Sequence, residues 1–154
     1  QRSFAFMHWK NFDRKLWEAL REKALSQVRT DCPPVLASDR DAGAIDMAVS
    51  NAERAGVLQS IEFSCRALSA IEPVGKGWVV TNPPYGLRVS SNKDLRNLYA
   101  QFGNVMEERC PGWRVAVLCS DNQLLRQSRL NLEPGFSTLN GGIPVRLSVG
   151  EVKQ

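Results

Sequence analysis

The sequence predicts an α/β protein whose sheet is mainly parallel. Short apolar segments alternate along the 154 residues with segments whose apolar side chains recur at helical spacing. Proline or glycine separates most of these segments, as is typical of the connections between strands and helices. The C-terminal part has the pattern of a hairpin, which adds an antiparallel strand at one edge of the sheet. The length corresponds to about one domain.

The first half of the chain alternates two predicted helices with two predicted strands. In order, they are a helix over 11–28, a strand over 35–39, a helix over 42–55 and a strand over 60–65. Pro33-Pro34 separates the first helix from the first strand. Asp41 is a suitable N-cap for the second helix, and Gly56 is a suitable residue to end it.

The second half continues the alternation and closes with the hairpin. The expected elements are a strand over 78–81, a helix over 93–109, a strand over 113–119, a helix over 121–130 and hairpin strands over 136–139 and 144–149. The turn of the hairpin is expected at Asn140-Gly141-Gly142. The apolar stripe from Leu95 to Met106 lies on one helix face and predicts a core contact, and Trp113 is expected to pack there too.

Charge and cysteine content narrow the possible classes of protein. The net charge is +4, which is too small to indicate nucleic-acid binding by itself. The four cysteines form no CxxC pair and His8 is the single histidine, so no metal site is predicted and we expect reduced, mostly buried thiols. No apolar run is long enough to predict a membrane span. Without a signal-peptide pattern or an initial Met, we expect a cytoplasmic segment of a longer protein.

The segment Asn82-Pro83-Pro84-Tyr85-Gly86 follows a predicted strand directly. Ligands of such sheets bind beyond the carboxyl ends of the strands, where Asp39 and this segment are the two candidates. A proline turn with a surface tyrosine is the simplest explanation. Two prolines also fix φ and remove two N–H donors. What remains is a rigid corner with two hydrogen-bond acceptors, the Asn82 side-chain oxygen and the Pro83 carbonyl.

This corner suits an exocyclic amine on a planar base or an amide. Such a nitrogen is a poor nucleophile because its lone pair is delocalised. Two hydrogen bonds accepted from the NH₂ group draw the nitrogen toward tetrahedral geometry, and stacking on Tyr85 would hold the ring with about 1–3 kcal/mol. Methyl transfer at this corner would then depend on positioning and preorganised polarity, and it would need no general base with a tuned pKa.

The residues Val80-Thr81-Asn82-Pro83-Pro84-Tyr85-Gly86 resemble motif IV of the amino-methyltransferases that use S-adenosylmethionine. More of the chain is similar to one branch of them, the THUMP-associated ribosomal RNA guanine-N2 methyltransferases, whose members are often labelled N6-adenine-specific DNA methylases. The similar segments cover nearly the whole chain and comprise 4–9, 12–13, Trp17, 37–41, 44–45, 51–57 and 111–145.

The resemblance implies a Rossmann-like class I methyltransferase sheet and S-adenosylmethionine-dependent methylation of RNA. The implied target is guanine N2 of large-subunit ribosomal RNA. Methylation of DNA adenine N6 or of protein glutamine stays an alternative, because these enzymes share motif IV. Five cations flank the motif in sequence and are candidates for contacts with RNA phosphates: Arg66, Lys76, Arg88, Lys93 and Arg96.

The resemblance also implies a role for each residue of the site. Asp39 matches the acid that accepts hydrogen bonds from the cofactor's ribose hydroxyls. Asn82 and Pro83 would bind the target amine, and Asn82 also counts among the residues at the cofactor. Pro84 would shape the loop, Tyr85 would stack on the base, and the glycine that follows would permit close approach.

Two departures from the family pattern limit the expected activity. The glycine-rich cofactor loop and the strand before it are absent, and Ala67 stands where members usually carry an acid for the adenine amino group. We therefore expect residues 1–34 to form a helical segment and 35–154 to form a partial catalytic domain that is inactive alone. The absent strand would leave two inner sheet edges unpaired, for a homodimer or an altered strand order to cover. The non-enzymatic alternative is a module that binds nucleic acid or a partner without catalysis.

Overall fold

The computed structural model describes residues 3–29, 31–85 and 92–153. The chain divides into two compact units, Gln1–Val35 and Leu36–Gln154, which are described separately. The larger unit carries both sheets except for Val35, the first residue of β1, and the smaller unit carries the N-terminal helix.

The N-terminal unit is built around a cluster of aromatic rings. It contains the 3-10 helix η1 (Ala5–His8) and helix α1 (Arg14–Ser26). The ring of Phe6 lies 5.2 Å from that of Trp17 and 5.8 Å from that of Phe12, measured between centroids. Helix α1 begins later than the predicted 11–28 because the Asp13 carboxylate accepts a hydrogen bond from the Leu16 amide and so caps the helix.

The first part of the larger unit is a two-stranded sheet with one helix. Its elements are β1 (Val35–Asp39), α2 (Ala42–Ala55), the 3-10 helix η2 (Leu58–Ser60) and β2 (Ile61–Cys65). The Asp41 carboxylate caps α2 through the Gly43 amide, and Gly56 ends the helix with a φ of 72°, as the sequence predicts. The Arg66 amide donates to the Asp39 carbonyl, which places the carboxyl ends of β1 and β2 side by side.

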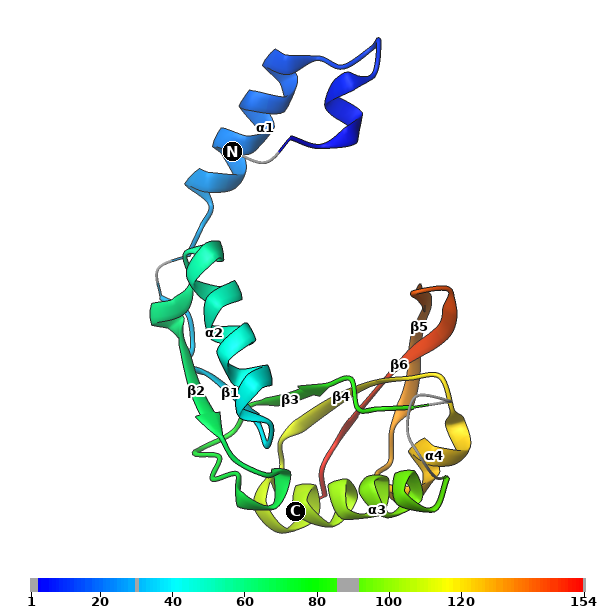
Figure 1. Cartoon of the computed structure of the whole chain (residues 1–154). Helices are drawn as coiled ribbons and strands as arrows, with labels where there is room; N and C mark the ends of the chain where they lie inside the picture. The colour runs from blue at the N-terminus through cyan, green and yellow to red at the C-terminus, as the bar shows by residue number, and fades with distance from the viewer. Residues whose placement is uncertain (1–2, 30, 86–91, 154) are drawn as a thin grey trace. The chain divides into compact units, whose positions relative to one another are not determined.

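The second part is a four-stranded sheet in the order β3-β4-β6-β5. Its strands and helices are β3 (Trp78–Thr81), α3 (Asn92–Arg109), β4 (Arg114–Cys119), α4 (Asn122–Gln127), β5 (Glu133–Asn140) and β6 (Ile143–Glu151), with the 3-10 helix η3 (Leu68–Ala70) before them. Strands β3 and β4 are parallel, whereas β6 is antiparallel to both β4 and β5. The predicted α/β architecture with a C-terminal hairpin is therefore confirmed (Figure 1).

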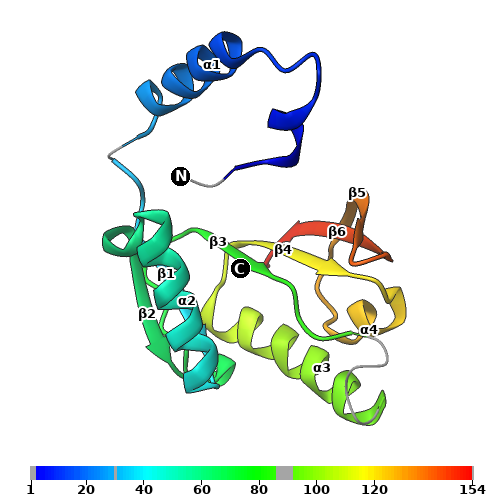
Figure 2. The same ribbon diagram turned by 45° about the horizontal axis from the view of Figure 1, so that its top comes forward.

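The core of this unit lies between α3 and one face of the four-stranded sheet (Figure 2). The apolar stripe of α3 faces inward as predicted, with Leu95, Tyr99 and Met106 at most 2% exposed. Helix α4 packs against α3, and Gly103 of α3 lies next to Ser128, the residue that follows α4. A Cβ at Gly103 would come within 1.8 Å of the Ser128 carbonyl oxygen, so this close approach requires glycine.

The C-terminal hairpin is longer than the sequence predicts. Asn140 already pairs with Ile143, so the turn consists of Gly141 and Gly142 alone, with φ of 58° and 83°. Strand β5 also includes Pro134 and has an irregularity before Ser137. Prolines are tolerated at an edge strand because one side of that strand needs no ladder partner.

The described strands form two separate sheets. Strand β1 pairs only with β2, and β3 pairs only with β4, within the described ranges. Apolar side chains on these two strands are exposed, with Leu36 at 56%, Trp78 at 50% and Val80 at 73%. Among the described strands, each of these two edges therefore retains backbone donors and acceptors beside apolar surface.

Candidate active site

The Asn82–Tyr85 corner begins where β3 ends. The last strand residue, Thr81, is in register with Val117 of β4, so the corner lies at the carboxyl edge of the parallel pair. Asn82 and Pro84 are exposed, whereas Pro83 and Tyr85 are half-buried. The Asn82 side chain is thus accessible at the edge where ligands of α/β sheets bind. Gly86, which was expected to permit close approach, lies outside the described residues.

Tyr99 of α3 supports the corner from inside the protein. Its side chain is 1% exposed, and its hydroxyl donates a long hydrogen bond of 3.5 Å to the Pro84 carbonyl. The same hydroxyl lies 3.1 Å from the Cys119 sulfur at the end of β4. Burial, and then the hydrogen bond with Cys119, raise the pKa of Tyr99 well above its usual value. Tyr99 therefore stays neutral and keeps its proton for this network.

Asn140 fixes the outer end of Tyr85. The Asn140 side-chain amide, next to the hairpin turn, donates a 2.9 Å hydrogen bond to the Tyr85 hydroxyl. The two residues are 55 positions apart in sequence, so the contact ties the β5–β6 hairpin to the corner. A half-buried ring with a fixed hydroxyl has one defined orientation, as a stacking surface requires.

Asp39 and Ala67 lie at the ends of neighbouring strands. The Asp39 side chain accepts a 2.9 Å hydrogen bond from the Asp41 amide, which holds the carboxylate at the end of β1. The Asp39 main-chain carbonyl accepts a hydrogen bond from the Arg66 amide. Ala67, which is exposed, is the residue after Arg66 and therefore lies near the end of β1. The structure therefore brings together the Asp39 and Ala67 positions, while Asn82 belongs to the other sheet.

The structure describes only some of the five cations that were expected to contact RNA phosphates. Arg66 forms an ion pair with Glu72 at 3.8 Å. Arg88 and the Lys93 side chain lie outside the described residues.

The sequence analysis missed the supporting roles of Tyr99 and Asn140, because it interpreted Tyr99 as a core residue and Asn140 as a turn residue. Both contacts are long-range, and no local pattern indicates them.

The cysteines differ in part from what the sequence predicts. All four cysteines are free thiols, but Cys32 and Cys65 are exposed, so the expectation of mostly buried thiols is wrong for half of them. Cys65 lies at the exposed end of β2, and Cys32 in the connection before β1. Among the described helices, none is long and apolar enough to cross a bilayer. The described side chains also include no group of three metal-ligating residues.

The chain belongs to a methyltransferase family. The family described as "UPF0020: RMKL-like, methyltransferase domain" matches residues 4–144, which is nearly the whole chain. This agrees with the resemblance carried by the Asn82–Tyr85 segment and its flanks.

Curated relatives include proteins named "Ribosomal RNA large subunit methyltransferase K/L" from several Shewanella strains. The one from Shewanella sp. (strain MR-4) is 36% identical over 149 residues, which cover 93% of this chain and 21% of the relative. The one from Shewanella baltica (strain OS155 / ATCC BAA-1091) is 34% identical, covering 97% of this chain and 22% of the relative. The chain thus spans about a fifth of the length of these relatives.

Solved structures share the fold. SMU.472, complexed with SAH, superposes with a TM-score of 0.82 at 23% identity, covering 99% of this chain and 41% of that one. A predicted N6-adenine-specific DNA methylase from Listeria monocytogenes str. 4b F2365 gives a TM-score of 0.72 at 27% identity, covering 96% and 38%. An RNA methyltransferase from Salinibacter ruber, in complex with S-adenosyl-L-homocysteine, gives 0.54 at 15% identity, covering 79% and 67%. The chain has the Rossmann-like class I methyltransferase fold.

Proposed function

We propose that this chain is part of the catalytic domain of an S-adenosylmethionine-dependent RNA methyltransferase. The proposed target is an exocyclic amine, guanine N2 of large-subunit ribosomal RNA. The observation that carries the proposal is the exposed Asn82 at the carboxyl end of β3, next to a Tyr85 ring whose hydroxyl Asn140 holds. The names of the Shewanella relatives support ribosomal RNA as the substrate.

The corner acts by accepting hydrogen bonds rather than by removing a proton. The Asn82 side-chain oxygen and the Pro83 carbonyl accept the two hydrogens of the target amine, which localises the nitrogen lone pair. Tyr85 stacks on the base and sets its plane. The proton that the amine loses passes to solvent, because Asn82 is exposed. Preorganised acceptors stabilise the developing positive charge on nitrogen in this way.

S-adenosylmethionine, when bound, supplies the methyl group. The described residues fit it in part: the exposed Asp39 carboxylate is held at the end of β1, where it can accept ribose hydroxyls. The Ala67 side chain offers no hydrogen-bond acceptor for the adenine amino group, so only a backbone group can serve there. The described residues contain no glycine-rich loop to complete the cofactor site.

We further propose that the chain lies within a longer protein, called the parent protein below. The proposal assigns residues 1–34 to an N-terminal helical segment and 35–154 to a partial catalytic domain. The unpaired edges of β1 and β3 support this, because a complete sheet needs a strand there. We place the parent protein in the cytoplasm, where ribosomal RNA is found. Covering of the edges by a homodimer is the alternative, and sedimentation of this chain alone tests it.

The nucleoside produced by the parent protein tests the proposed substrate. Large-subunit ribosomal RNA is incubated with the parent protein and S-adenosylmethionine, digested, and analysed by chromatography and mass spectrometry. The expected product is N2-methylguanosine. N6-methyladenosine would contradict the guanine assignment and favour the adenine alternative. Absence of any methylated nucleoside, with methylation of a glutamine peptide instead, would contradict RNA as the substrate class.

A further inference from the structure

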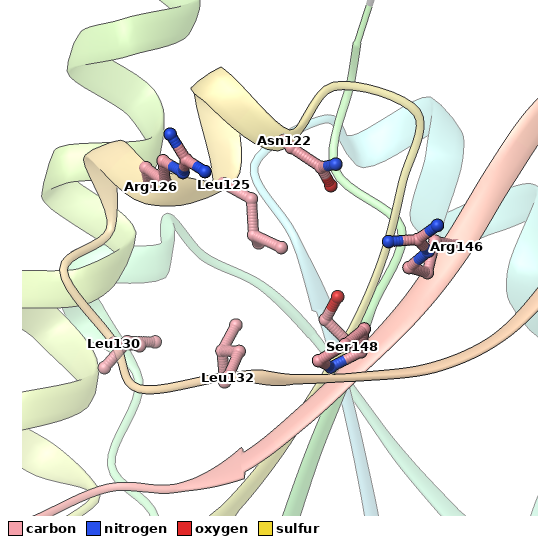
Figure 3. Close-up of a pocket in the computed structure, with 8 residues that line it drawn as sticks. Asn122, Leu125, Arg126, Leu130, Leu132, Arg146 and Ser148 are labelled. Atoms are coloured by element: carbon pink, nitrogen blue, oxygen red, sulfur yellow. The ribbon is translucent and has the colours of Figure 1, made fainter.

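A pocket of about 230 Å³ lies between α4, β6 and the segment that leads into β5. Its apolar floor includes Leu125, Leu130 and Leu132, and its polar lining includes Arg126, Arg146 and Ser148 (Figure 3). The two arginines come from different elements, α4 and β6. Sequence reasoning had not associated these residues, because they meet only through the fold.

Both arginines are available for an external anion. Each is exposed, and Arg146 donates from Nε to the Ser137 hydroxyl at 3.3 Å. None of the ion pairs found within the described ranges includes Arg126 or Arg146. Both guanidinium groups border one pocket, so an anion bound there is attracted by two positive charges. Guanidinium groups also match phosphate oxygens through paired hydrogen bonds.

Ser148 gives the pocket a buried polar group. Its side chain is 3% exposed, and Figure 3 shows its hydroxyl directed from β6 toward α4 across the pocket. No hydrogen bond to this hydroxyl is found within residues 3–29, 31–85 and 92–153. Among the described residues, the buried side-chain atoms without a partner do not include this hydroxyl, so it has access to the pocket that Ser148 lines. The Ser148 hydroxyl can therefore donate to an anion that enters the pocket.

The pocket is close to the candidate acceptor corner. Arg146 pairs with Cys119 across the β4–β6 ladder, and Cys119 contacts Tyr99 beneath the corner. Strand β6 lies two positions from β3 in the sheet, which corresponds to about 10 Å. One RNA strand can therefore place a base at Tyr85 and a neighbouring phosphate at the pocket.

We propose that this pocket binds a backbone phosphate of the RNA substrate, next to the nucleotide that is methylated. Arg126 and Arg146 donate to the phosphate oxygens, the Ser148 hydroxyl adds a third donor, and the leucine floor packs against the sugar. This inference rests on the proposed function, since it assigns RNA as the ligand. It adds a site outside the motif and explains how a chain of net charge +4 concentrates its positive charge where RNA needs it.

RNA binding by the chain itself tests the site without any methyl transfer. A fluorescein-labelled single-stranded oligoribonucleotide is titrated with wild-type chain and with Arg126→Ala, Arg146→Ala and the double variant, at several salt concentrations. Each single substitution is expected to weaken binding about three- to tenfold and to lower the salt slope by about one. Ser148→Ala is expected to weaken binding about two- to fivefold with an unchanged slope, because a hydroxyl releases no counterion.

Arg54→Ala is the matched control, because Arg54 is an exposed arginine near the end of α2, in the part built on the two-stranded sheet. It should bind the oligoribonucleotide as the wild type does. Equal losses in Arg54→Ala and the pocket variants, or no loss in the pocket variants, would overturn the proposal. Displacement of the RNA by a polyglutamate peptide of equal charge, at equal concentration, would overturn RNA as the ligand class. A parent protein that fails to transfer methyl groups while these affinities behave as expected would contradict the proposed function alone.

Discussion

Tyr99 is the residue that most directly connects the core to the candidate site. It fills the space between α3 and the sheet, and its hydroxyl meets both the Pro84 carbonyl and the Cys119 sulfur. A tyrosine in the apolar stripe of a helix looks like an ordinary core residue in sequence. Its polar function becomes visible only when β3 and β4 are placed beside the helix.

Tyr99→Phe is predicted to lower the free energy of unfolding by about 1 kcal/mol. The buried Cys119 thiol and Pro84 carbonyl lose a partner, while the ring still fills the core. Urea unfolding of the chain measures this difference. Ser26→Ala is the control, because the Ser26 hydroxyl bonds only locally to the Lys23 carbonyl at an exposed helix end. A variant as stable as the wild type would contradict the network.

The raised pKa of Tyr99 predicts that the difference in stability between the wild type and Tyr99→Phe depends on pH. The pKa of Tyr99 in the folded chain lies above the ordinary value of 10.0, so the folded state keeps the proton that the unfolded state loses. The stability that Tyr99 contributes is complete below pH 10 and declines as the pH rises further. The gap in stability between wild type and Tyr99→Phe should therefore narrow between pH 9 and pH 11. A gap that widens over this range would contradict the direction of the shift.

At the scale of elements, the β5–β6 hairpin belongs to the site as well as to the sheet. Asn140 next to its turn donates to Tyr85, and Arg146 on its second strand lines the proposed phosphate pocket. All of β5 is exposed, so this strand contributes little to the core. A hairpin with this character is suited to contact a substrate.

Asn140→Ala in the parent protein is predicted to slow methyl transfer about three- to tenfold, because the Tyr85 ring loses a fixed orientation. Tyr85→Phe should have a similar effect, since it removes the same hydrogen bond and keeps the ring. The double variant should be no slower than either single one if Asn140 acts through Tyr85. Asn104→Ala, on the exposed side of α3, is the control. If the rate loss of the double variant equalled the product of the losses from Asn140→Ala and Tyr85→Phe, this positioning role would be contradicted.

Most elements follow from local patterns, and the exceptions have physical reasons. Strands β1 and β3 and helix α2 occupy the predicted residues, since caps such as Asp41 and Gly56 act locally. Strand β5 begins earlier than predicted and includes Pro134, a residue type that local patterns place outside strands but that an edge strand accepts. The Asn82–Tyr85 corner could be found because its residues are consecutive. The contact of Asn140 with Tyr85 joins distant segments, so the sequence offers no periodicity that indicates it.

At the scale of the whole molecule, the separation into two sheets is the main structural fact. The proposed cofactor residues Asp39 and Ala67 follow one sheet, and the proposed acceptor residues from Asn82 onward follow the other. A methyl donor and its acceptor must meet, so both sheets have to be parts of one complete sheet in an active enzyme. The exposed apolar side chains on β1 and β3 are consistent with this requirement.

The isolated chain is predicted not to bind S-adenosylmethionine in the micromolar range. It lacks the glycine-rich loop, and Ala67 offers no acid for the adenine amino group. Isothermal titration calorimetry of the chain, with the parent protein as the positive control, measures this directly. Micromolar binding by the 154 residues alone would contradict the view that the cofactor site is incomplete.

The central claim is that the Asn82–Tyr85 corner holds the amine that receives the methyl group. The most direct measurement is the rate of methyl transfer to ribosomal RNA by the parent protein carrying Asn82→Ala. We predict a loss of at least about 100-fold, with unchanged affinity for RNA and an unchanged unfolding midpoint, because one preorganised acceptor is removed. Transfer within a few-fold of the wild-type rate would contradict the assignment of this corner as the acceptor site.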